Sequence, residues 1–147
     1  MIVREARPAE HRIWAEMLAK LHPDQSSDEF EHEIADLVAL PEPYVCFLAF
    51  DDTGSPVGMV DARVRNYAEA APNLRAGYVE DIWVEPDHRR AGVGQALIAA
   101  VEQWARDQGL NWLGSDTEAD NELSQAWHAA IGFETVERLV VFGKALD

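Results

Sequence analysis

The chain has 147 residues, and its 12 lysines and arginines face 27 aspartates and glutamates, which gives a formal net charge of −15. This length fits one domain with a single core, and an apolar fraction of 48% argues against a disordered chain. An acidic surface repels nucleic acids and anionic membranes, so we expect neither as a partner. It attracts small cations, although acidity can also serve solubility alone.

In chain order, hydrophobic periodicity and turn residues predict a strand over 2–5, helices over 8–21 and 26–38, and strands over 44–50, 57–64 and 78–84. A helix over 92–108, a strand over 110–115, a helix over 121–131 and a last strand or strands over 133–146 follow. Neither repeats nor a linker interrupt this order. It predicts one domain over residues 1–147, of the α+β or mixed α/β class.

The cellular compartment follows from what the sequence lacks. No apolar run reaches the roughly 20 residues needed to span a bilayer, and the start MIVREARPAE lacks the apolar stretch of a secretory signal. The single cysteine, Cys46, lies in the apolar run YVCFLAF, where we expect a buried core thiol. A cytoplasmic location is therefore expected. The five histidines show no metal-ligand spacing, and no metal is expected.

A basic, glycine-containing loop joins a strand to a helix in YVEDIWVEPDHRRAGVGQALIAAV. Gly92 and Gly94 allow a tight turn and close approach to a ligand. The N–H groups and dipole of the following helix favour an anion there, and Arg89 and Arg90 add positive charge. The loop is therefore predicted to bind a pyrophosphate.

The pattern R-x-x-G-x-G from Arg89 to Gly94 resembles the acetyl-coenzyme A loop of the GNAT acetyltransferases. The resemblance continues in Asn121, Ser124 and Gly132-Phe133, with His128 where that family usually has tyrosine. It implies a central, mostly antiparallel, splayed sheet flanked by about four helices. It also implies these acetyl-coenzyme A contacts: Ile82, Trp83, Val84, Arg89, Arg90, Ala91, Gly92, Val93, Gly94 and Asn121.

Nearly the whole chain is similar to bacterial aminoglycoside 6'-N-acetyltransferases, most specifically in VEDIWVEPDHRRAGVG and SDTEADNELSQAWHAAIGFETVERLVVFGK. The resemblance implies acetyl transfer to an amine of a cationic small molecule, with resistance to these antibiotics, and a homodimer in which the run ERLVVFGKAL pairs or exchanges. The implied substrate contacts are Tyr67, Glu80, Asp116 and Glu137, together with His22, which replaces a family tryptophan.

Carboxylates bind ammonium groups through charge-assisted hydrogen bonds, which supports this set independently. Asp116 is the first candidate for the base that deprotonates the amine, Glu80 is the second, and His128 is a candidate acid for the leaving thiolate. Simpler structural roles remain open. Asp116 could cap a helix, Glu80 could form a buried ion pair, and His128 could be a core histidine. Tyr67 and Glu137 could be ordinary surface residues.

Two alternative functions also remain open. The first is an acetyltransferase for polyamines or protein amines, which an acidic surface would suit equally well. The second is a sensor that binds acyl-coenzyme A without turnover.

Overall fold

The computed structural model describes residues 1–147, which divide into two compact units, Met1–Ser115 and Asp116–Asp147. The first contains the sheet and three of the α-helices, and the second contains the fourth α-helix and the C-terminal segment.

The first unit is built on a five-stranded sheet in the order β1-β2-β3-β4-β5. Its strands are β1 (Ile2–Glu5), β2 (Tyr44–Phe50), β3 (Pro56–Arg65), β4 (Ala76–Val84) and β5 (Leu113–Gly114). The first four pair antiparallel in sequence order, and β5 is parallel to β4. The predicted mostly antiparallel sheet is confirmed, and the predicted strand over 110–115 is reduced to two residues.

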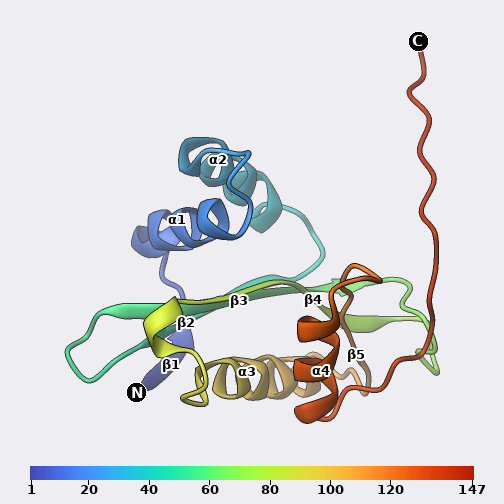
Figure 1. Ribbon diagram of the computed structural model, residues 1–147. Helices are drawn as coiled ribbons and strands as arrows, with labels where there is room; N and C mark the ends of the chain where they lie inside the picture. Colours follow the sequence, from blue (N-terminus) through green and yellow to red (C-terminus); the bar gives the residue numbers. More distant parts are fainter. The chain divides into compact units, whose positions relative to one another are not determined.

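Helices cover both faces of this sheet (Figure 1). The helices α1 (His11–Leu21) and α2 (Ser27–Val38) pack on one face, and α3 (Val93–Asp107) lies on the opposite face. Single 3₁₀ turns at Pro8–Glu10 and Pro86–His88 precede α1 and α3. The predicted cap of the second helix is confirmed, because the Ser26 side chain accepts a hydrogen bond of 3.1 Å from the Glu29 N–H.

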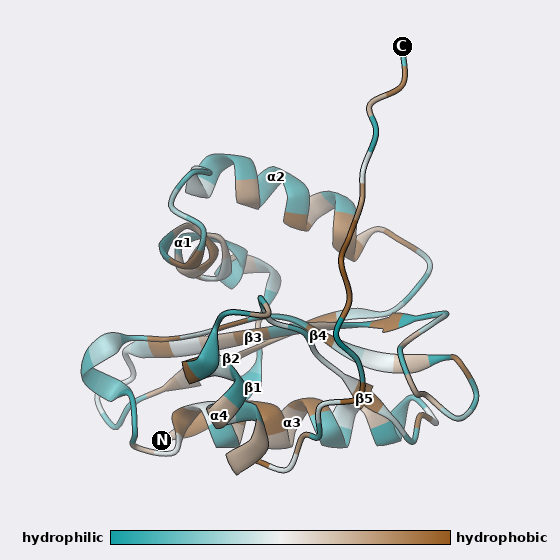
Figure 2. Cartoon of the chain, turned by 45° about the vertical axis from the view of Figure 1, so that its right-hand side comes forward, coloured by the Kyte–Doolittle hydropathy of each residue, from teal (hydrophilic) through white to brown (hydrophobic).

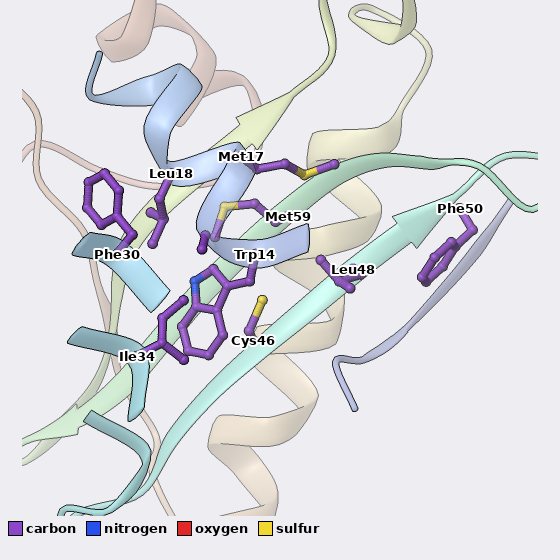
Figure 3. Packing of buried hydrophobic residues seen from close by; sticks show 10 residues of the cluster. Trp14, Met17, Leu18, Phe30, Ile34, Cys46, Leu48, Phe50 and Met59 are labelled. Atoms are coloured by element: carbon purple, nitrogen blue, oxygen red, sulfur yellow. The ribbon is translucent and has the colours of Figure 1, made fainter. Parts of the chain in front are cut away.

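The core between α1, α2 and the sheet is centred on Trp14, whose side chain is surrounded by aliphatic and sulfur-containing neighbours (Figure 3). Cys46 belongs to this cluster and is buried, as predicted, and burial raises the pKa of its thiol. On the other face, α3 contributes Leu97 and Val101, which are fully buried. The first unit therefore has a well-packed layer on each side of its sheet.

The second unit holds α4 (Glu122–Ala130) and a C-terminal segment without regular secondary structure. The predicted strand or strands over 133–146 are wrong for this structure, because the segment contains no strand. A strand needs a neighbouring backbone for its hydrogen bonds, and the segment pairs with none. Its apolar residues, visible as the brown stretch of the C-terminal segment in Figure 2, are largely exposed, up to 89% at Phe142.

Candidate active site

The loop before α3 is shaped for close contact with a ligand. Arg90 has a φ of 63° and Gly92, the residue before the helix, has a φ of 82°. A left-handed conformation is unusual for arginine, and such conformations concentrate at functional sites. A Cβ added at Gly92 would meet no atom within 4 Å, so the space beside the backbone is open.

The N-terminus of α3 presents backbone donors. The first bond of the helix runs from the Ala96 N–H to the Gly92 carbonyl, at 3.0 Å. The N–H groups of Val93, Gly94 and Gln95 lie ahead of it and have no acceptor within the helix. These donors and the helix dipole fit the predicted pyrophosphate site.

The two predicted arginines of this loop differ. Arg89 folds back on β4, where its Nε donates to the Val84 carbonyl at 2.9 Å and its guanidinium lies 4.8 Å from the centre of the Trp83 ring. No such bond is found for Arg90, whose backbone conformation forms the turn at Ala91. Arg89 therefore ties the loop to the strand, and Arg90 remains the more available cation.

The pairing of β4 with β5 ends early. Only Gly77 and Tyr78 pair with β5, opposite Leu113 and Gly114. Beyond Tyr78, the edge of β4 that faces away from β3 has no strand partner. The predicted splay is thus confirmed, and the stretch from Ile82 to Val84, predicted to contact the cofactor, lies on this unpaired edge.

A β-bulge interrupts the pairing of β3 with β4. Asp61 pairs with Asp81 and the next residue, Ala62, pairs with Val79, so Glu80 has no partner. Asp61 faces α1, where its carboxylate accepts a 2.8 Å bond from Trp14 Nε1. Asp81 lies opposite Asp61 in the register, so its side chain is on the same face of the sheet. Glu80 is on this face too, because it binds Arg65, which shares the face of Asp61 by strand alternation. The bulge therefore turns two consecutive carboxylates to one side of the sheet.

Glu80 is held by two hydrogen bonds. Arg65 donates from Nε and from one terminal nitrogen to the two carboxylate oxygens, at 2.8 and 2.7 Å. The guanidinium also lies 3.6 Å from the centre of the Tyr78 ring. The alternative predicted from the sequence was a buried ion pair; an ion pair is present but is only partly buried, and the sequence did not indicate Arg65 as the partner. A substrate ammonium would therefore compete with Arg65 for Glu80.

His22 and Asp81 form a second pair. His22 ends α1, and its Nε2 lies 2.7 Å from Asp81 Oδ1. The two side chains are 47% and 24% exposed, so the pair is open to solvent. Behind it, Asp61 is 1% exposed. Burial first, and then the charge of Asp81, raise the pKa of Asp61 well above its usual range.

Tyr67 lies in the loop between β3 and β4. Its neighbour Ala68 and Ala71 are buried in a small cluster with Tyr78, while Tyr67 itself is 57% exposed. Ala70 and Leu74 adopt positive φ angles of 61° and 63°, which bend this loop. The buried alanines thus anchor the loop and present the Tyr67 ring at its surface.

In the second unit, Asp116 is exposed and lies just beyond the end of β5. It does not cap α4, because that position belongs to Asn121, whose side chain accepts a 3.0 Å bond from the Ser124 N–H. The helix-cap alternative for Asp116 is therefore wrong. Asn121, predicted to bond the cofactor, uses its carbonyl oxygen for the cap and has its amide N–H groups as donors.

His128 is oriented by its own helix. Its Nδ1 lies 2.8 Å from the Ser124 carbonyl, and its ring meets Trp127 and Phe133 edge-on, at 5.0 and 5.2 Å between ring centres. The carbonyl places a proton on Nδ1 and the lone pair of the neutral ring on Nε2. Donation to a leaving thiolate from Nε2 would therefore require the imidazolium form.

The C-terminal segment contains Glu137, predicted to bind substrate, as an exposed residue. The following Arg138 donates to Gln125 Oε1 at 3.2 Å and so links the segment to α4. The sequence analysis assigned this arginine no role.

No group of three or more histidine, cysteine, aspartate or glutamate side chains is arranged to hold a metal ion. No helix is both long and apolar enough to cross a membrane.

Comparison with known proteins is consistent with this geometry. The model of the acetyltransferase (GNAT) family matches residues 9–133. An aminoglycoside N(6')-acetyltransferase type 1 of Stenotrophomonas maltophilia is 36% identical over 146 residues, which cover 99% of this chain and 94% of that protein. The enzyme of the same name from Klebsiella aerogenes is 33% identical over 147 residues, which cover 99% of this chain and 97% of that protein.

Solved structures agree. The aminoglycoside 6'-N-acetyltransferase of Acinetobacter haemolyticus is 31% identical and has a TM-score of 0.88, and the match covers 100% of this chain and 100% of that chain. Another aminoglycoside N-acetyltransferase, in complex with the bisubstrate analogue CoA-S-monomethyl-acetylneamine, has a TM-score of 0.90 at 29% identity, with 99% and 98% covered.

Proposed function

The chain belongs to the acetyltransferase (GNAT) family, and from this premise we propose that it transfers the acetyl group of acetyl-coenzyme A to the 6'-amine of aminoglycosides. The observation that carries the proposal is the combination of an unpaired β4 edge with an open, donor-rich N-terminus of α3. Relatives that match nearly the full chain are named for this reaction.

The residues of the first unit fit acetyl-coenzyme A as the donor substrate. The N–H groups of Val93 and Gly94 and the side chain of Arg90 would hold the pyrophosphate. The backbone from Ile82 to Val84 would pair with the pantetheine arm and hold the thioester oxygen as charge develops. We include Arg89, Ala91 and Gly92 of the first unit and Asn121 of the second unit in this contact set. Because the family match spans both units, we propose that residues 1–147 act as one catalytic domain.

On the acceptor side, we propose that Asp116 binds the attacking ammonium and accepts its proton, with Glu80 as the second candidate base. Asp116 is exposed and is not a helix cap, and Glu80 is held by Arg65. The amine nitrogen then forms a bond to the acetyl carbon and the thiolate leaves. His128, as the imidazolium, would protonate that thiolate. Tyr67, Glu137 and His22 complete the proposed substrate contacts.

An amine panel tests the reaction class. Thiol release from acetyl-coenzyme A is measured with kanamycin, with a polyamine and with a peptide amine as acceptors. We expect turnover with kanamycin at far lower acceptor concentration than with the others. Preference for the polyamine or the peptide would favour the first alternative function, and absence of thiol release with every amine would favour the sensor.

The donor site has its own test. Gly94→Asp places a carboxylate at the start of α3, where it repels and obstructs the pyrophosphate. Calorimetry with coenzyme A should show at least a 10-fold loss of affinity, the scale of losing a charge-assisted contact. A folded Gly94→Asp protein with parental affinity would refute the loop assignment.

We also propose a homodimer. Leu123 of α4 and Val140, Val141 and Phe142 of the C-terminal segment are 81%, 77%, 82% and 89% exposed. Such a concentration of apolar surface is typical of an interaction site. The segment is extended and pairs with no strand, so a second copy could supply the missing backbone partner.

A cytoplasmic location and a role in antibiotic resistance complete the proposal. Acetyl-coenzyme A is a cytoplasmic metabolite, and acetylation removes a positive charge from the drug. Expression in a susceptible bacterium should raise the inhibitory concentration of kanamycin, and an unchanged concentration would argue against the resistance role.

A further inference from the structure

Asp81, which pairs with the proposed substrate contact His22, has no assigned role of its own. Asp81 immediately precedes the unpaired stretch from Ile82 to Val84, and its carboxylate lies on the face of the sheet that carries Glu80. His22 comes from the end of α1, 59 residues away in sequence. Two elements thus bring an imidazole and a carboxylate together beside the proposed acceptor site.

We propose that Asp81 is a positioning residue that fixes His22 as a binding group for an ammonium of the acceptor other than the one acetylated. This inference rests on the proposed function and deepens it. With the ring neutral, Nε2–H donates to Asp81 Oδ1, which leaves the lone pair on Nδ1. Nδ1 forms no hydrogen bond in the structure, so it is available as an acceptor.

The charges around the pair favour a cation. Glu80 lies on the same face of the sheet and is neutralised by Arg65, and the buried Asp61, whose pKa is raised, holds its proton, so Asp81 supplies the negative charge of the pair. Nearby, Lys20 pairs with Glu85. On the α2 side, Phe30 contacts the His22 ring, with 6.0 Å between ring centres, and Glu33 accepts from Gln25. Asp24 lies two residues beyond His22. An acceptor with several ammonium groups therefore meets more carboxylates than cations here.

Steady-state kinetics of two variants tests the proposal. Asp81→Asn removes the charge that fixes the ring, and His22→Gln keeps a donor toward Asp81 but removes the Nδ1 acceptor of the imidazole. Each should raise KM for kanamycin roughly 10-fold or more, the scale of one charge-assisted hydrogen bond, with little change in kcat.

Glu85→Gln provides a matched control. Glu85 is 23% exposed and pairs with Lys20, which is 51% exposed, so it resembles Asp81 in burial and in partner exposure. Glu85 makes no contact with His22, so the KM of Glu85→Gln for kanamycin should stay within about twofold of the parent value. Melting temperatures of all three variants should match the parent, since surface changes of this kind alter stability little.

A series of acceptors, each lacking one amine of kanamycin, identifies the ammonium that is bound. The KM penalty of Asp81→Asn should vanish for the acceptor that lacks this amine and persist for the others. An equal penalty for every acceptor, a fall in kcat without a change in KM, or parental kinetics in both variants would overturn the inference. A parent protein that acetylates no aminoglycoside would instead overturn the proposed function.

Discussion

The two units differ in how they are held together. Every buried hydrophobic residue lies between Trp14 and Ala105, within the first unit, whereas α4 of the second unit has no buried residue. The first unit carries the donor-site loop, and the second carries Asp116, His128 and Glu137. The proposed donor-site loop therefore stands on a packed scaffold, while part of the proposed acceptor chemistry stands on a unit whose helix has no buried residue. We expect the two units to respond differently to mutation.

The largest effect on stability should come from the core of the first unit. Trp14→Ala empties a fully buried site and removes the donor to Asp61. The free energy of unfolding should fall by about 3–5 kcal/mol. Leu123→Ala, on the exposed face of α4, should change it by no more than about 0.5 kcal/mol. Denaturant titration measures the free energy of unfolding of both variants, and an equal decrease in the two would contradict the expected difference between the units.

The largest effect on turnover should come from the second unit. Asp116→Asn keeps the shape of the side chain but removes its charge and basicity. We expect kcat to fall about 10²-fold, the usual scale for a positioned acid–base group, with the affinity for acetyl-coenzyme A unchanged. A raised KM with parental kcat would make Asp116 an anchor only, and parental kinetics would leave Glu80 as the base.

The buried carboxylate of the first unit should affect the pH dependence of stability. The raised pKa of Asp61 means that the folded state holds a proton that the unfolded chain releases above about pH 4. The free energy of unfolding of the parent therefore falls as the pH rises from about 4 through the folded pKa. Asp61→Asn keeps an acceptor for Trp14 and should lack this decrease. Parallel pH profiles of the two proteins would contradict the assignment.

The smallest effect on protomer stability should come from the C-terminal segment. Phe142→Ser replaces a side chain that is 89% exposed. It should change the free energy of unfolding of the protomer by no more than about 0.5 kcal/mol but shift the proposed dimer toward monomer. Sedimentation at micromolar concentration measures this. Leu40→Ser, which replaces an exposed apolar residue of the first unit, serves as the control. A parent protein that is monomeric at this concentration would contradict the proposed dimer.

The sequence predicted the helices and long strands well, because their apolar residues recur at the spacing of each element and because Ser26 and Gly92 mark the starts of α2 and α3. The donor loop was also readable, since its arginines and glycines lie together in the chain. These features depend on local sequence alone.

The acceptor side was less predictable because it depends on contacts between distant residues. The bulge at Glu80 arises from the register of two strands, and no local pattern indicates it. The bonds of Glu80 to Arg65 and of His22 to Asp81 span 15 and 59 residues. The C-terminal run has the composition of a strand, but strand formation needs a partner edge that composition does not specify.

The position of acetylation tests the central claim most directly. Kanamycin is incubated with the parent protein and acetyl-coenzyme A, and the product is analysed by NMR. The account predicts one acetyl group, on the 6'-nitrogen, and no product from an analogue that carries a hydroxyl group at that position. Acetylation of a different amine, or equal turnover of the hydroxyl analogue, would contradict it.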